Sequence, residues 1–328
     1  MALVSELKHN VEELLNEEIG IKLYFLMKTS SGNKIKFANI ADETLTDKSE
    51  DDTTSQELLD GFKSAILKKF EEHEEDEEIL LLSSADERKN ALYMYDLDTL
   101  PEEMQMLQKV MRDDREYEKF YFSEDSLSNV AAFLIVIGNA EKKLALYKQQ
   151  YPISLLKRDK CLLTPIPHKN RLARVKEDIL RVDFNFQFFV YEEIVYVNAI
   201  DSVEKICGFQ EIIMKEAEKS ITAIEAADLL EDVEVLIDEV ENVSFARKLT
   251  KIYKESKVVG KVAKKDIINF TQTHPFFSKY PLKLNATGDK FVLDTKRSKN
   301  AFIKLLNDDL LTSDLTKAQY ESLAKNNV

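Results

Sequence analysis

The part of this 328-residue chain that most resembles a catalytic site reads GDKFVLDTK, at residues 288–296. Asp294 and Lys296 have the acid-x-lysine spacing of metal-dependent nucleases, and Asp289 is a candidate second acid. Such a site needs two acids that converge on one metal ion, but residues five apart on one strand point to opposite faces. The spacing therefore favours an ordinary basic hairpin without a catalytic residue, and a metal-dependent nuclease remains the alternative.

Other common signatures of chemistry are missing from the sequence. It contains no GxxxxGK[ST] or GxGxxG pattern for binding phosphates and no GxSxG pattern for a serine nucleophile. The four histidines have no histidine or cysteine partner at the spacing of zinc ligands. Cys161 and Cys207 are the only cysteines, which is typical of a protein in the reducing cytoplasm. We expect no metal ion, no cofactor and no enzymatic activity.

A polar strand is a second candidate for a site. Asp183, Asn185 and Gln187 alternate with three phenylalanines, the period-two pattern of a half-buried strand. We therefore expect these three polar side chains on one face of a sheet, where they line a polar cleft or simply face solvent.

Positive charge is concentrated in residues 244–265, which carry eight lysines and arginines and a single acid. A helix is predicted over 243–255, with an apolar stripe of Phe245, Leu249 and Ile252. On its opposite face lie Arg247, Lys251 and Lys254, with Lys248 at the edge. A merely solvated helix usually interleaves acids that relieve the repulsion between like charges. The pattern therefore indicates an anionic ligand.

The charge is also segregated along the whole chain, whose net charge is −14. Residues 1–130 carry 15 basic and 32 acidic residues, and residues 211–243 carry 2 and 11. Residues 244–304, the basic segment, carry 15 basic and 4 acidic residues, a net charge of +11. The obvious polyanion for such a segment is a nucleic-acid backbone. An acidic protein surface, including the N-terminal half of this chain, and the absence of any ligand are the alternatives.

The side chains expected to contact DNA follow from this charge pattern. They are Arg247, Lys248, Lys251, Lys254, Lys261, Lys264, Lys265, Lys296, Arg297 and Lys299, with Arg171 and Arg174 in the basic stretch 168–176 as further candidates.

Hydrophobic periodicity predicts that these residues are carried by an α+β protein. The N-terminal region should form an antiparallel or mixed sheet with flanking helices. Its predicted helices cover 3–16 and 56–70, and its strands cover 21–28, 34–40, 91–97, 119–123, 131–138, 143–150 and a hairpin at 183–200. Two domains are expected: an acidic N-terminal α+β domain, 1–210, and a mainly helical C-terminal domain, 211–328.

The C-terminal domain contains the basic segment. The pattern predicts one helix over 202–230 interrupted near Gly208, further helices at 243–255, 264–273 and 297–307, and a small hairpin at 282–295. Thr316 and Gln319 have capping-box spacing for a last helix at 317–325. Helix, helix, hairpin, helix is the order of elements in a winged-helix-like unit, although many small domains share it.

Four stretches of the sequence carry a family resemblance. They are DFNFQFFVYEEIVYVNAIDSVEKICGF (183–209), SFARKL (244–249), IINFTQTHP (267–275) and FIKLLNDDLLTSDLTKAQYESLAK (302–325). In this order they resemble KwaB, the soluble B component of the bacterial Kiwa anti-phage defence system. The resemblance spans roughly residues 130–325, and the first 130 residues carry no matching motif.

The resemblance implies a homodimeric effector that binds DNA, blocks its replication or expression, and works with a multi-pass membrane protein, the Kiwa A component. It implies a cytoplasmic protein that reaches the inner membrane through this partner. It supplies no functional residues, so the expected contacts depend on the charge pattern. Two alternatives remain: a nuclease that uses Asp289, Asp294 and Lys296 or the Asp183 strand, and a scaffold whose basic region binds an acidic protein.

Overall fold

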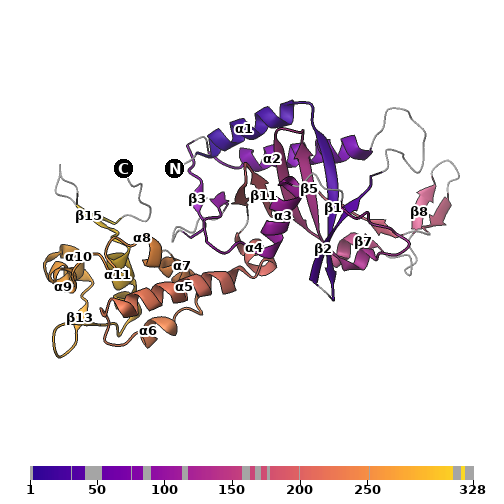
Figure 1. Ribbon diagram of the computed structural model, residues 1–328. Helices are drawn as coiled ribbons and strands as arrows, with labels where there is room; N and C mark the ends of the chain where they lie inside the picture. The colour runs from indigo at the N-terminus through magenta and orange to yellow at the C-terminus, as the bar shows by residue number, and fades with distance from the viewer. Residues whose placement is uncertain are drawn as a thin grey trace. The chain divides into compact units, whose positions relative to one another are not determined.

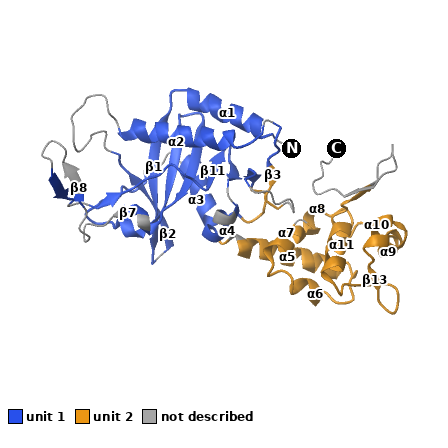
Figure 2. Ribbon diagram, turned by 180° about the vertical axis from the view of Figure 1, so that it is seen from behind, with its two compact units in different colours: residues 1–79, 90–94, 100–207 blue, residues 80–89, 95–99, 208–328 orange. Residues whose placement is uncertain are grey.

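The computed structural model describes residues 3–30, 32–40, 54–74, 76–83, 90–112, 117–156, 163–166, 171–175, 178–198, 200–250, 252–312 and 319–321. The chain divides into two compact units (Figures 1 and 2). Unit 1 comprises residues 1–79, 90–94 and 100–207, and unit 2 comprises residues 80–89, 95–99 and 208–328. The α+β class expected from the sequence is confirmed, because sheet and helices both contribute to the described part of the chain.

A mostly antiparallel sheet organises unit 1. Within the described ranges its strands from unit 1 follow the order β2-β1-β5-β6-β11-β12-β4. These strands are β1 (Gly20–Thr29), β2 (Gly32–Ala38), β4 (Tyr93–Met94), β5 (Val130–Gly138), β6 (Lys143–Gln149), β11 (Phe188–Tyr191) and β12 (Ile194–Val197). Strand β3 (Leu80–Leu81) belongs to the residues of unit 2. Two short ladders accompany it, β7 (Leu155–Leu156) with β10 (Ile179–Leu180) and β8 (Leu163–Ile166) with β9 (Arg171–Arg174).

One face of the sheet is covered by helices α1 (Val4–Asn16) and α2 (Thr54–Glu71), as Figure 1 shows. Buried residues recur on both helices at the spacing of one helical face. They pack on side chains that lie opposite one another across the strands, such as Ile135 and Leu146, and then Leu146 and Phe189. Because successive side chains of a strand point to opposite faces, every second residue of these apolar strands lies on the face covered by α1 and α2.

The other face of the sheet carries helix α3 (Glu102–Arg112), which contacts β5 and β6. Its buried residues include Met104 and Leu107. No helix was predicted here, because the segments on both sides have strand-like patterns. Tyr147 belongs to this face, pairs with Leu134 and Phe188 on the neighbouring strands, and stacks on the Phe188 ring with 4.4 Å between the ring centroids. Unit 1 therefore has helices on both sides of its sheet.

The hairpin predicted over 183–200 is confirmed by β11 and β12, but residues 183–187 are not part of its first strand, because β11 begins only at Phe188. In one strand Phe186 and Phe188 would share a face. Instead Phe186 joins the core under α1 and α2, and Phe188 lies on the α3 face. Phe184 packs on α2 where Gly61 has no side chain, since a Cβ atom there would lie 2.2 Å from the phenyl ring. The three polar residues of this segment therefore do not share a strand face.

Two other predicted strands are shorter than expected. Only Tyr93 and Met94 of the segment 91–97 form a strand, β4. The segment 119–123 contributes a single bridge between Lys119 and Phe37.

Unit 2 is mainly helical. Its described elements are α5 (Phe209–Ala226), α6 (Glu234–Ile237), α7 (Val243–Leu249), α8 (Ile252–Glu255), α9 (Lys264–Thr273), α10 (Pro275–Lys279), α11 (Lys296–Leu306), the hairpin β13 (Lys283–Leu284) with β14 (Phe291–Val292), and β15 (Leu310–Thr312) with β16 (Gln319–Glu321). Unit 1 ends with α4 (Ile200–Ile206). Gly208 separates α4 from α5 at a φ of +58°, which confirms the predicted interruption.

Two predictions for unit 2 are wrong. The helix expected over 243–255 is two short helices, α7 and α8, and Lys251 between them lies outside the described residues. The helix expected over 317–325 is contradicted at Gln319–Glu321, which form strand β16 against β15. A capping-box spacing marks where a helix can begin, but here pairing with a neighbouring strand takes its place.

Candidate nucleic-acid interface

Helix α7 begins the basic segment and is anchored by its apolar side. Asn242 caps the helix, accepting a hydrogen bond from the backbone N–H of Phe245. The predicted stripe of Phe245, Leu249 and Ile252 is buried. Arg247, however, is only 4% exposed, so the predicted place of its side chain on a solvent-facing cationic surface is wrong. Helix α7 ends at Leu249, so a helical wheel continued to residue 255 does not describe this surface.

Lys254 belongs to a polar network in unit 2. Its ammonium group forms an ion pair with Asp98, which also accepts a hydrogen bond from the Tyr253 hydroxyl. The Lys254 and Tyr253 hydrogen bonds hold the pKa of Asp98 below its usual value. The same hydroxyl oxygen lies 3.1 Å from the buried carboxylate of Glu216, and Lys219 lies 2.6 Å from Glu216. Lys254 therefore already has an anionic partner within its own unit.

Two more of the lysines predicted to contact DNA, Lys264 and Lys299, also have acidic partners. Lys264 lies 2.9 Å from Asp228 and 3.7 Å from Asp289. Lys290 also pairs with Asp228, and the hydrogen bonds from Lys290 and Lys264 lower the pKa of that aspartate. Lys299 lies 2.9 Å from Glu239, and both side chains are largely shielded from solvent. A part of the positive charge thus serves to hold unit 2 together.

Lys248 is half-buried, and its ammonium group donates a hydrogen bond to the side-chain oxygen of Asn300 at 3.0 Å. This contact ties α7 to α11. We therefore assign Lys248 mainly to the interior contacts of unit 2.

A group of exposed lysines surrounds the beginning of α9. This group, the α9 lysine cluster, consists of Lys257, Lys261 and Lys265. No acidic residue of the described ranges pairs with any of the three, and Lys261 donates to the backbone oxygen of Ser256 at 2.8 Å. Because that acceptor is neutral, the positive charge of Lys261 remains uncompensated.

Ser256 fixes the connection that carries this cluster. Its hydroxyl is buried, donates to the backbone oxygen of Leu306 at 2.6 Å, and accepts hydrogen bonds from the N–H groups of Val258 and Val259. A connection held this way presents its lysines from an ordered backbone. The α9 lysine cluster is therefore well placed to meet an external anion.

The beginning of α11 exposes two more cations, Lys296 and Arg297. Thr295 and Ser298 form a capping box there, with reciprocal hydrogen bonds between side chains and backbone. No ion pair joins Lys296 or Arg297 to an acid of the described ranges. In unit 1, Arg171 and Arg174 are exposed on strand β9.

The acids of the alternative nuclease site are occupied elsewhere. Asp294 forms an ion pair with Lys283, and this contact lowers its pKa. Asp289 accepts hydrogen bonds from Thr287 and, at 3.1 Å, from Asn285. In the part of the chain that the structure describes, no three histidine, cysteine or acidic side chains are grouped so that they could hold a metal ion.

Sequence reasoning missed the acids that neutralise the basic segment, because they are distant in the chain. Asp98 lies 156 positions before Lys254, and Glu239 lies 60 positions before Lys299. A signal for part of this pairing was present: the acidic stretch 211–243, which contributes Asp228 and Glu239, immediately precedes the basic one. Adjacent blocks of opposite charge predict contacts within the chain as well as a ligand.

Comparison with known proteins identifies the family. The model of the family described as "Kiwa protein KwaB-like" matches residues 127–316. The Kiwa protein KwaB of Escherichia coli O55:H7 (strain RM12579 / EPEC) is 31% identical over 321 residues, which cover 98% of this chain and 97% of that protein. No solved structure matches the chain.

The chain therefore belongs to the KwaB-like family of Kiwa proteins, components of an anti-phage defence system. The family resemblance seen in the sequence is confirmed. Among the described helices none combines the length and the apolar character needed to cross a membrane.

Proposed function

We propose that this protein is the DNA-binding effector of an anti-phage defence system and that it blocks the replication or expression of phage DNA without cutting it. The observation that carries the proposal is the exposed positive charge of unit 2 that the acids of the described residues leave uncompensated. It comprises Lys257, Lys261, Lys265, Lys296 and Arg297. Like charges gathered on one unit are unfavourable unless an anion meets them, and a phosphate backbone does so with many contacts.

The proposed binding surface is narrower than the charge pattern alone indicated. Arg247 is buried, and Lys254, Lys264 and Lys299 have carboxylate partners. We keep the α9 lysine cluster and the two cations at the start of α11 as the main phosphate contacts, with Arg171 and Arg174 as a separate candidate surface in unit 1.

The proposal includes two partners. A membrane-embedded protein of the Kiwa system would bring the effector to the inner membrane, and two copies of this chain would form a homodimer. The net charge of −17 on residues 1–130 suits contact with that partner, since cytoplasmic loops of membrane proteins are rich in lysine and arginine.

The proposal is tested by mixing the purified full-length protein with linear and circular DNA, with and without magnesium or manganese. We expect binding in every mixture and intact DNA after incubation, because neither Asp289 nor Asp294 is arranged to share a metal ion with another acid. Degradation that requires the divalent metal and disappears in the Asp294→Ala variant would instead support a nuclease. DNA affinity that never exceeds weak non-specific levels at physiological salt would favour the scaffold.

A further inference from the structure

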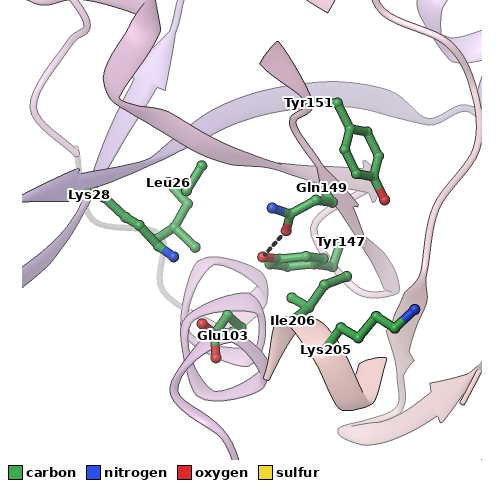
Figure 3. Close-up of a pocket in the computed structure, with 9 residues that line it drawn as sticks. Leu26, Lys28, Glu103, Tyr147, Gln149, Tyr151, Lys205 and Ile206 are labelled. Atoms are coloured by element: carbon green, nitrogen blue, oxygen red, sulfur yellow. Dashed lines mark hydrogen bonds between the residues drawn. The ribbon is translucent and has the colours of Figure 1, made fainter. Parts of the chain in front are cut away.

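Unit 1 contains a cavity of about 490 Å³ that the DNA-binding proposal does not use. It lies on the α3 face of the sheet, where the adjacent strands β1, β5 and β6 meet helices α3 and α4 (Figure 3). Pockets that bind small molecules commonly have volumes of about 300–1,000 Å³. The cavity is therefore large enough for a ligand of nucleotide size.

An irregularity of the sheet shapes the cavity wall. Leu26 of β1 pairs with Ala132 of β5, but the next residue, Met27, pairs with Val130. Ala131 is the extra residue of this β-bulge, and it lines the cavity. Bulges are frequent next to functional sites, because they redirect the backbone and the side chains around them. The small side chain of Ala131 leaves this wall open.

The cavity presents polar groups with unused hydrogen-bonding capacity. The buried hydroxyl of Tyr147 donates to the side-chain oxygen of Gln149 at 3.2 Å (Figure 3). This contact leaves the amide nitrogen of Gln149 as a donor, and it has no acceptor among the described residues. Tyr151, a residue that is 47% exposed, contributes an aromatic ring on which a planar group can stack.

The charge of the cavity contrasts with that of its surroundings. Lys28 and Lys205 are exposed residues of its lining, and no acid of the described ranges forms an ion pair with either one. The acidic side chain in the lining is that of Glu103, whose pKa is raised by burial and by the charge of Glu102. A net positive cavity, in a chain whose residues 1–130 carry a net charge of −17, selects for anions.

We propose that this cavity binds a nucleoside phosphate. Lys28 and Lys205 lie on opposite sides of Tyr147 and Gln149 (Figure 3), so one of the two would contact the phosphate. The amide of Gln149 would hydrogen-bond the base, and the Tyr151 ring would stack on it. A simple anion such as inorganic phosphate would contact a lysine only. The Tyr151 ring and the Gln149 amide favour a ligand that also has a base. The site does not depend on the DNA-binding surface of unit 2.

The test is a calorimetric titration of the full-length protein with AMP, ATP and a 5′-phosphorylated oligonucleotide, with adenosine and inorganic phosphate as probes that lack one half of the ligand. We expect AMP or ATP, or the phosphorylated end of the oligonucleotide, to bind at least tenfold more tightly than adenosine or phosphate. The three nucleotide probes distinguish a free nucleotide from the end of a nucleic acid. One of the two variants Lys28→Ala and Lys205→Ala should weaken this binding about tenfold, and the variant that does so identifies the phosphate side of the cavity.

Lys34→Ala is the matched control, because Lys34 pairs with Met27 in the same hairpin and lies on the opposite sheet face from Lys28. It should leave nucleotide affinity unchanged, and so should loss of the α9 lysine cluster. Two results would overturn the proposal: nucleotides that bind no better than inorganic phosphate, or nucleotide binding that survives both Lys28→Ala and Lys205→Ala.

Discussion

At the scale of single residues, several side chains that the sequence suggests for a functional site instead form structural contacts. Asp183 is the clearest case. It lies 2.7 Å from Lys148, whose side chain is 4% exposed on strand β6. A lysine so deeply buried is costly unless an acid pairs with it. Asp183 is therefore a structural counter-charge, and periodicity could not show this because Lys148 lies 35 positions away.

Replacing Asp183 with asparagine should lower the free energy of unfolding by about 2 kcal/mol, because a buried ammonium group loses its partner at a partly exposed site. Urea denaturation of the full-length protein at pH 7 measures the change. Glu124→Gln removes an exposed carboxylate instead and should change stability by less than about 0.5 kcal/mol. Equal effects of the two substitutions would contradict the role of Asp183.

The same pair predicts a dependence on pH. Burial opposes ionisation of Asp183, but the hydrogen bonds from Lys148 and from the backbone of Asn185 outweigh it and lower its pKa below 3.8. A carboxylate whose pKa is lower in the folded state contributes its full stability to the fold at a pH above its unfolded-state pKa. This contribution is lost as the pH falls through its folded-state pKa. Below about pH 4 the wild-type protein should therefore lose part of its stability advantage over Asp183→Asn.

At the scale of helices and strands, periodicity predicted those elements well that have one clear apolar face. The bounds of α9 agree with the prediction, and those of α2 and α11 agree within two residues. Prediction failed where tertiary contacts decide the conformation. The apolar stripe of 243–255 was correct, but the helix breaks after Leu249 and Arg247 is buried. Helix α3 is an exception, because it was missed although Met104, Leu107 and Met111 recur at helical spacing.

Arg247→Ala tests this description of α7. We expect the free energy of unfolding to fall by about 2 kcal/mol, because a large side chain with an apolar stem leaves a buried site. Lys265→Ala, an exposed substitution in the first turn of α9, should change stability by no more than about 0.5 kcal/mol. If chemical denaturation shows no loss in the Arg247 variant, its side chain faces solvent as the helical wheel predicted.

At the scale of the whole molecule, the sequence shows that charge is segregated along the chain. In the folded protein, the cations of the basic segment fall into two groups. Acids of unit 2, including Asp98, Asp228 and Glu239, neutralise some cations of the basic segment. The remaining cations stay exposed. Composition could predict the excess of positive charge but could not tell which lysines are internal partners, because that depends on contacts between distant parts of the chain.

The cavity of unit 1 illustrates the same limit. Its lining comes from three strands and two helices, and Lys28 and Lys205 lie 177 positions apart in the sequence. No motif marks these residues. The sheet order places the strand residues side by side, and helix α4 contributes Lys205.

The most direct test of DNA binding by unit 2 is the salt dependence of DNA affinity, measured for the wild-type protein and for the triple variant Lys257→Ala, Lys261→Ala and Lys265→Ala. Each phosphate contact contributes a slope of about −0.9 to the plot of log affinity against log salt. The triple variant should weaken binding to every DNA sequence alike and reduce the slope by about two to three units. The double variant Lys22→Ala with Lys34→Ala, in the N-terminal hairpin, should keep the wild-type slope. Full affinity and an unchanged slope in the triple variant would contradict DNA binding at the α9 lysine cluster.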